Sequence, residues 1–189
     1  MPCQAPHDQA ETAFHTALIS VLYPMGLVNS ILHWGSATLT NKDGSRKAAD
    51  GGWSPRGTLK RPSVVLEVAW SDTSAKLRRD CQYWVDPLKG EANMAIGIKI
   101  HKNAPHITFS QWEWNPELSR AIQTSCLNIT KSDDGIQFNP QATPQLVIPF
   151  HLFFRRPAEN SRERDLIFRA QDLIELATEV WDEQYHEQE

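Results

Sequence analysis

The chain has 189 residues, of which 40% are hydrophobic and 22% charged, and this predicts a single globular domain over residues 1–189. The net charge of −4 argues mildly against a protein that binds nucleic acid. Cys3, Cys81 and Cys126 form neither a close pair nor a zinc-binding spacing, which favours reduced thiols in a cytoplasmic or nuclear protein. Residues 1–11 are polar and the longest apolar stretch, Ala17–Val28, is short, so neither a signal peptide nor a membrane span is expected.

Periodicity and turn residues predict the elements of the first part of the chain. Apolar residues recur at three- and four-residue spacing from Ala10 to Val21, which predicts a helix over Asp8–Leu22. Pro24 and Gly26 should end this helix. An extended segment, a turn, a short strand and a loop are then expected, in that order: Ser30–Leu39, Asn41–Gly44, Arg46–Asp50 and Gly51–Pro62.

The second part begins with the clearest strand of the sequence. Ser63–Trp70 contains a near-continuous apolar run, typical of a strand covered on both faces. Ser71 or Asp72 should cap a helix over Thr73–Val85. Three further strands and a long C-terminal helix starting near Asn160 and Glu163 follow, whereas Pro116–Thr143 shows no clear pattern: the strands are Met94–His101, Ile107–Trp114 and Leu146–Phe154. This order favours an α/β fold with a central mixed β-sheet flanked by helices.

Two acidic residues stand where a pair of strands can bring them together. Asp50 ends one predicted strand, and Glu67 lies 17 positions later within the next one. Burying Glu67 in an apolar strand is costly unless the carboxylate is paired or bound to a metal, which favours a functional site. Two such oxygen donors suit Mg²⁺ or Mn²⁺. Asp50 alone is equally well explained as a turn residue before Gly51 and Gly52.

The residues around this pair resemble a known family. Asp50, followed by Pro62-Ser-Val-Val-Leu-Glu67-Val-Ala-Trp-Ser71 and then by Asp80 and Trp84, is similar to the PD-(D/E)XK, or restriction-endonuclease-like, superfamily. The resemblance is to uncharacterised fungal proteins of this type in particular, and it covers about residues 8–115. It implies a restriction-endonuclease-like core, a metal-dependent nuclease acting on nucleic acid, and a protein for which a homo-oligomer is one option.

The resemblance also implies roles for single residues. Asp50 and Glu67 would bind Mg²⁺ or Mn²⁺, with the backbone carbonyl of Val68 as a third ligand. Glu11 is the candidate for the acidic residue that the superfamily carries on its first helix. The chain departs from the pattern at Ala49, where the family has proline.

A second departure concerns catalysis, because Ala69 stands where the family has its motif lysine. Another cation would have to replace it in an active enzyme. The candidates, in order of preference, are Lys76 on the following helix, Lys99 on the next strand, and Lys47. The side chain of Lys47 should point to the face opposite Asp50 if that strand is regular.

Basic residues are concentrated in one part of the sequence. Lys42–Lys102 holds 12 basic and 7 acidic residues, a local charge of +5, whereas the rest of the chain carries −9. Such a region can meet a phosphate backbone, and Lys47, Arg78 and Arg79 are the candidate nucleic-acid contacts. The alternative is an ordinary mixed surface, with the arginines on a solvated helix face.

Three functions therefore stay open. The first is a divalent-metal-dependent phosphodiesterase with a variant site. The second is a catalytically degenerate module that binds protein or nucleic acid, which Ala69 and the acidic total favour. The third is a recruited pocket that acts on a small molecule, for example in fungal secondary metabolism, and the sequence neither supports nor excludes it.

Overall fold

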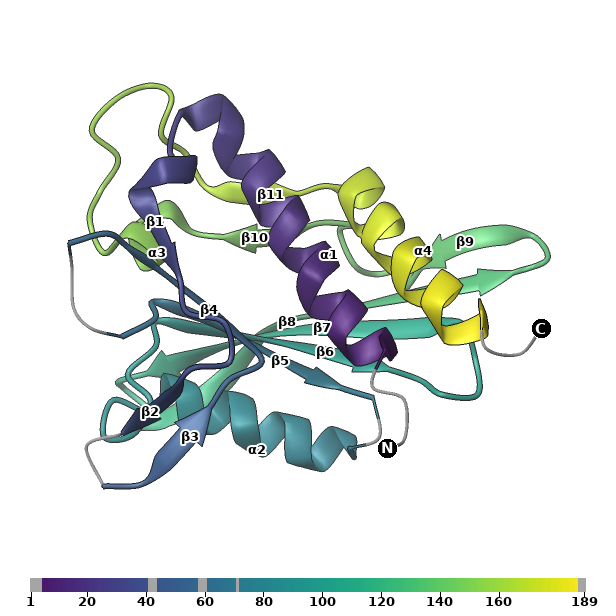
Figure 1. The fold of residues 1–189 in the computed structure, drawn as a ribbon, viewed down its shortest axis with the longest axis horizontal. Helices are drawn as coiled ribbons and strands as arrows, with labels where there is room; N and C mark the ends of the chain where they lie inside the picture. The colour runs from purple at the N-terminus through teal and green to yellow at the C-terminus, as the bar shows by residue number, and fades with distance from the viewer. Residues whose placement is uncertain (1–4, 41–43, 58–60, 71, 187–189) are drawn as a thin grey trace.

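The computed structural model describes residues 5–40, 44–57, 61–70 and 72–186 (Figure 1). Its elements, in chain order, are α1 (Ala5–Leu22), η1 (Tyr23–Met25), η2 (Val28–Ser30), β1 (Ile31–His33), β2 (Thr38–Thr40), β3 (Arg46–Ala48), β4 (Gly51–Pro55), β5 (Val64–Ala69), α2 (Ser74–Val85), β6 (Met94–Ile100), β7 (His106–Asn115), β8 (Arg120–Ser132), β9 (Gly135–Phe138), β10 (Leu146–Ile148), α3 (Phe150–Phe154), β11 (Leu166–Phe168) and α4 (Ala170–His186).

A seven-stranded mixed sheet forms the centre of the fold, in the order β1-β4-β5-β6-β7-β8-β9. The neighbours β5 and β6 run parallel, and the other neighbouring pairs in this sheet are antiparallel. Parallel neighbours need a crossover connection, and α2 provides it. Two small antiparallel ladders, β2–β3 and β10–β11, stand apart from the central sheet.

Helices cover both faces of this sheet. The helices α1 and α4 lie side by side on one face, and α2 lies on the other (Figure 1). Alternate residues of β5 join the two cores: Val64, Leu66 and Val68 pack in the cluster containing α1 and α4, and Val65 and Ala69 pack in the cluster containing α2. Glu67 therefore projects from the α2 face. The predicted α/β architecture, with a central mixed sheet, flanking helices and a long C-terminal helix, is confirmed.

The expectation of a loop from Gly51 was wrong in its first part. Gly51–Pro55 is the buried strand β4, which pairs with β1 on one side and with β5 on the other. The glycines allow close packing here, because an added Cβ would lie 3.0 Å from the Trp53 ring at Gly51 and 3.1 Å from Pro62 at Gly52. The strand expected over Arg46–Asp50 is shorter than predicted, ends at Ala48 and pairs with β2.

Other expectations needed correction at element ends. Thr73, rather than Asp72, caps α2, since its hydroxyl accepts a hydrogen bond from the Lys76 N–H at 3.2 Å; Ser71 lies outside the described residues. Ser30–Leu39 contains two short strands with a turn between them, and residues 41–43 of the expected following turn are not described.

The C-terminal half needed similar corrections. Leu146–Phe154 is a three-residue strand followed by a short helix, with Pro149 between them. No helix begins at Asn160: the Glu163 carboxylate is bound by both terminal nitrogens of Arg156 at 2.7 Å, and α4 starts only at Ala170. Pro116–Thr143, which showed no pattern, contains most of the long strand β8 and all of β9.

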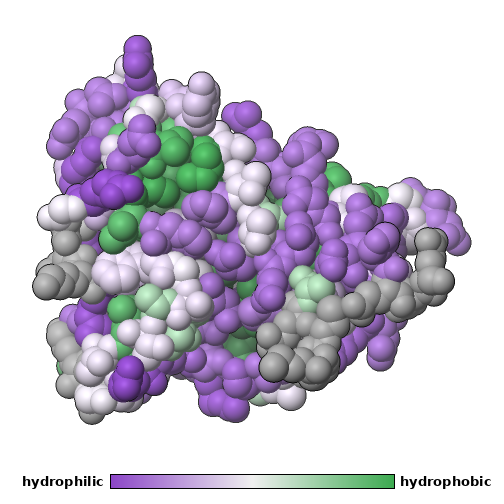
Figure 2. Space-filling view, in the orientation of Figure 1, coloured by the Kyte–Doolittle hydropathy of each residue, from purple (hydrophilic) through white to green (hydrophobic). Residues whose placement is uncertain are grey.

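The surface that carries α1 and α4 is largely hydrophilic, with a cluster of hydrophobic side chains near β1 and α3 (Figure 2). Leu32 of β1 is among the exposed large hydrophobic residues of the described chain. Within the described ranges, no helix combines the length and the hydropathy needed to cross a membrane.

Candidate functional site

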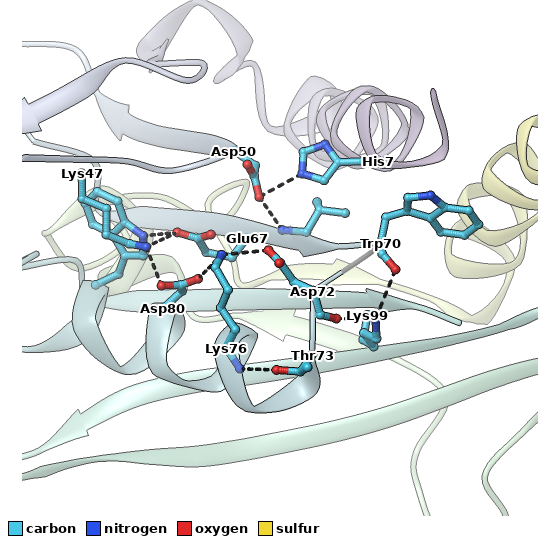
Figure 3. Close-up of polar contacts among 12 residues, drawn as sticks. His7, Lys47, Asp50, Glu67, Trp70, Asp72, Thr73, Lys76, Asp80 and Lys99 are labelled. Atoms are coloured by element: carbon cyan, nitrogen blue, oxygen red, sulfur yellow. Dashed lines mark hydrogen bonds and ion pairs between the residues drawn. The ribbon is translucent and has the colours of Figure 1, made fainter. Parts of the chain in front are cut away.

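A cavity of about 360 Å³ opens on the α2 side of β5, and we refer to it as the carboxylate cavity. It is lined by His7, Lys47, Ala48, Asp50, Glu67, Val68, Ala69, Trp70, Asp72, Lys76, Leu77 and Asp80. These residues come from α1, β3, β5, α2 and the connections between them. The cavity thus gathers both members of the predicted acidic pair together with two lysines (Figure 3).

The pairing of β4 with β5 explains how the two acids meet. Gly51 is opposite Leu66 in the antiparallel register. Asp50 comes directly before Gly51 and Glu67 directly after Leu66, so the same register sets them opposite each other. The sequence predicted that the strand over Arg46–Asp50 would pair with the strand that contains Glu67. Instead, β4 pairs with β5, and Asp50 reaches Glu67 because it directly precedes β4.

Asp50 is held by a backbone group and by a histidine. Its Oδ2 accepts a hydrogen bond from the Val68 N–H at 2.7 Å. Val68 lies beyond Gly51, the first residue of β4, so β4 supplies no pairing residue there. The same oxygen lies 3.3 Å from Nε2 of His7 on α1, while Nδ1 of His7 is 3.0 Å from Asp8. The hydrogen bond to Asp50 raises the pKa of His7 to about 9 against the opposing effect of burial, so the imidazole is cationic at neutral pH.

Glu67 is buried, with 6% of its surface exposed. Its Oε1 accepts a hydrogen bond from the Trp84 indole N–H and lies 3.5 Å from the ammonium of Lys47. Burial raises the pKa of Glu67 to about 7; Asp50 and Asp80 act in the same direction, and Lys47 and Trp84 oppose it. The carboxyl can therefore exchange a proton near neutral pH, as expected of a reactive site.

Lys47 points into the carboxylate cavity, contrary to the expectation from a regular strand. Its Nζ is 2.7 Å from Asp80 Oδ1 and lies over the rings of Tyr83 and Trp84, at 5.7 and 5.8 Å from their centroids. The reason is that β3 ends at Ala48 and the chain bends before β4, so strand alternation does not continue from Lys47 to Asp50. Lys47 is thus paired inside the cavity, away from the exposed surface expected of a nucleic-acid contact.

The two other candidate lysines occupy different places. Lys76 extends from the first turn of α2 into the cavity, where its ammonium is 2.8 Å from Asp72 and 3.1 Å from Asp80 (Figure 3). Lys99 donates to the backbone carbonyl of Asp72 at 2.7 Å and, more weakly, to that of Trp70 at 3.4 Å. Lys99 does not line the carboxylate cavity; it holds the chain between β5 and α2.

The remaining candidates lie outside the carboxylate cavity. Arg78 and Arg79 are exposed on α2. Glu11, the candidate acid of the first helix, pairs with His33 at 3.1 Å and is not among the lining residues.

Sequence reasoning missed four residues that complete the site: His7, Asp72, Asp80 and Trp84. Lys76, Asp80 and Trp84 follow each other at intervals of four, so they lie on one helix face, and this spacing was a usable signal. His7 gave no such signal, because it reaches Asp50 only through the packing of α1 against the sheet.

The donor set of the cavity fits a hard divalent cation held by few protein ligands. Asp50 Oδ1 and Glu67 Oε2 accept no hydrogen bond from the described residues. Across the same residues, no group of three or more His, Cys, Asp or Glu side chains is arranged around an ion position. Mg²⁺ is commonly bound by only one or two carboxylates, with water and substrate phosphates completing its shell. The Val68 carbonyl stays a predicted ligand.

Comparison with solved structures supports a nuclease-like fold. The chain is similar to a protein from Anabaena variabilis ATCC 29413 described as a "putative nuclease belonging to DUF820", with a TM-score of 0.50 and 10% identity over 93% of this chain and 83% of that one. At this identity the similarity concerns the fold alone. No family model matches the chain, and no curated protein matches its sequence. The resemblance to fungal proteins stays a prediction.

Proposed function

We propose that the chain is a divalent-metal-dependent phosphodiesterase of the PD-(D/E)XK type that cleaves nucleic acid. The observation that carries the proposal is that Asp50, just before β4, and Glu67, on the neighbouring strand β5, line one cavity with two lysines in a nuclease-like fold. A buried carboxyl with a pKa near 7 beside cationic groups is a costly arrangement, and such arrangements concentrate at functional sites.

The chain's own groups have distinct parts in this proposal. Asp50 and Glu67, with the Val68 carbonyl, would hold Mg²⁺ or Mn²⁺, which supplies Lewis acidity and a more acidic bound water. The Val68 N–H orients Asp50, and the Trp84 N–H orients Glu67. Each contact leaves the second oxygen of the carboxylate available to a ligand.

Lys47 is the best substitute for the missing motif lysine. Of the three candidates, it is the one whose ammonium contacts Glu67, at 3.5 Å, and it lines the same cavity as Ala69. Lys76 adds a second positive charge near Asp80. Together they would stabilise the negative charge that develops on a phosphoryl group.

Cleavage assays with purified protein test the proposal. Plasmid DNA, single-stranded DNA and RNA are incubated with Mg²⁺ or Mn²⁺, and cutting should depend on the metal and stop in EDTA. Asp50→Asn and Glu67→Gln should each lower the rate by at least a hundredfold, as expected for removal of a metal ligand. Glu117→Gln, an exposed acid in the turn between β7 and β8, is the matched control and should cut normally.

Lysine variants test which candidate lysine replaces the motif lysine in cleavage. Lys47→Met should reduce cleavage more than Lys76→Met, and adding Ala69→Lys to the Lys47→Met variant should restore part of the rate. Wild-type protein that cuts none of the substrates with either metal would refute the proposed activity. Equal activity of wild type and Glu67→Gln would attribute any cutting to a contaminant.

A second candidate function rests on the ion-pair network. Lys47 and Lys76 already form ion pairs with Glu67, Asp72 and Asp80, and Ala69 cannot supply the motif lysine. A degenerate module that binds protein or nucleic acid would keep such a network for stability. It would bind its partner equally well in EDTA, and Asp50→Asn would not weaken that binding. The carboxylate cavity is also the candidate pocket for the third possible function, which is to act on a small molecule.

A further inference from the structure

A second cavity lies on the other side of the first turns of α2, and we refer to it as the cationic cavity. It measures about 180 Å³. Its polar lining includes Arg78 of α2, Lys99 of β6, His101 just after β6, Thr108 and Ser110 of β7, and Gln123 of β8. Leu77 lines both cavities, so they are immediate neighbours. The volume is that of roughly six water molecules, which suits a phosphate group with part of its ester.

The charge of the cationic cavity is opposite to that of its neighbour. None of the described residues that line it is an Asp or a Glu. Arg78 makes no hydrogen bond or ion pair with any described residue, and Lys99 uses its ammonium only on two backbone carbonyls. These cations therefore lack a carboxylate partner in the cavity, unlike Lys47 and Lys76.

Two histidines gather at the same end of β6 and β7. The rings of His101 and His106 stack with centroids 3.9 Å apart and planes inclined by 3°. Burial lowers the pKa of His101, and His106 and Lys99 lower it further. Burial also lowers the pKa of Lys99; Asp72 opposes this and Lys102 adds to it. An anion in the cavity would favour the charged form of Lys99.

Phosphate is the anion that matches these donors. A guanidinium binds phosphate oxygens through two parallel N–H groups, and Lys, Ser, Thr and Gln side chains supply most other phosphate contacts in nucleic-acid complexes. We propose that the cationic cavity is a phosphate-binding subsite, in which Arg78, Lys99 and His101 hold a phosphate of the nucleic-acid strand next to the one at Asp50 and Glu67. The subsite rests on the proposed function for its substrate, but its binding can be measured without catalysis.

The test compares two adjacent arginines of one helix. Arg78 lines the cationic cavity, whereas Arg79 is exposed and lines neither cavity, so Arg78→Ala and Arg79→Ala change the same charge on the same element. Binding of a fluorescein-labelled 12-mer, single- or double-stranded, is followed by anisotropy in EDTA, where a metal-dependent enzyme does not cut. Arg78→Ala should weaken binding about tenfold and lower the salt slope by about one, whereas Arg79→Ala should weaken it less than twofold.

Inorganic phosphate tests whether the cationic cavity binds a free phosphate ion or only a phosphate within a nucleic-acid strand. If the cavity holds an isolated phosphate, 10 mM phosphate should raise the melting temperature of wild type and Arg79→Ala but not of Arg78→Ala. If only the 12-mer shows the dependence on Arg78, the subsite recognises a strand. His101→Gln provides a second variant outside α2 and should also weaken binding of the 12-mer, but without the change in salt slope, because burial lowers the pKa of His101.

Equal losses for Arg78→Ala and Arg79→Ala would overturn the subsite, because they indicate general electrostatic attraction. That result together with metal-dependent cutting by wild type would reject the subsite and leave the nuclease intact. Selective loss in Arg78→Ala without any cutting would reject the nuclease and retain the subsite.

Discussion

Replacing Glu67 with Gln should make the protein more stable at alkaline pH while removing its proposed metal ligand. The side chain is buried, and both groups that contact it, Trp84 Nε1 and Lys47 Nζ, do so at Oε1. A glutamine of the same shape can present its carbonyl oxygen to these two donors and turn its amide nitrogen toward the cavity. The substitution therefore removes a buried negative charge without opening a void.

The size of the effect follows from the pKa of Glu67, which burial raises from 4.5 to about 7. A carboxyl with a raised pKa in the folded state lowers stability as pH rises through the interval from 4.5 to 7, because the unfolded chain releases the proton first. Above pH 7 the full penalty is present, roughly 3 kcal/mol at about 1.4 kcal/mol per pKa unit. For a chain of this length, that corresponds to an increase in Tm of roughly 6–12 °C.

Urea denaturation at pH 4.5, 7 and 9 measures this difference. Glu67→Gln should match wild type near pH 4.5, exceed it increasingly up to about pH 7, and keep the same advantage at pH 9. Glu67→Ala is the contrasting variant, and it should lose stability at every pH because it leaves the Trp84 N–H without an acceptor. A glutamine variant no more stable than wild type at pH 9 would mean that the ionised carboxylate is well compensated, and the reasoning would be refuted.

Three other outcomes test the same geometry. Mn²⁺ affinity, measured by calorimetry, should fall as pH drops below about 7, because Glu67 must lose its proton to bind; a constant affinity from pH 6 to 8 would contradict this. His7→Asn should be less stable than wild type by about 1–2 kcal/mol at pH 6, and the difference should fade as pH rises through about 9, since the raised pKa of His7 stabilises the fold only while it is protonated; a constant difference in urea midpoints would exclude the ion pair as its cause. Gly90→Ala should cost at least about 2 kcal/mol, because its Cβ would lie 2.4 Å from backbone atoms of Trp84, whereas Gly57→Ala meets no atom within 4 Å and should cost about 1 kcal/mol for its positive φ; equal losses in thermal denaturation would argue against this packing.

Several parts of the fold could be predicted because their signal is local. The apolar run of β5 indicated a strand buried on both faces, and all six residues of β5 are buried in the structure. Three- and four-residue spacing indicated α1. The helix was predicted to begin at Asp8, whereas it begins at Ala5. Glu67 was conspicuous because a carboxylate in an apolar strand needs a partner.

Other parts could not be predicted because glycine and proline occur both in loops and at the buried positions or ends of regular elements. Gly51 and Gly52 were interpreted as the start of a loop, yet they permit the close packing of β4 against Trp53 and Pro62. Leu146–Phe154 was expected to be one strand, but the strand ends at Ile148 and Pro149 precedes a short helix. The local sequence is the same in both interpretations, and only the neighbouring segments decide between them.

The sequence by itself determined the elements built from periodic apolar residues and the presence of an acidic pair in need of a partner. Only the tertiary structure decided which groups surround that pair. The register of β4 against β5 sets Asp50 opposite Glu67, the bend after β3 turns Lys47 inward, and the packing of α1 brings His7 to Asp50. Arg78 and Arg79 are alike in the sequence, but only one lines the cationic cavity. Such differences depend on contacts between distant segments, and these are fixed by how the sheet and helices pack rather than by neighbouring residues.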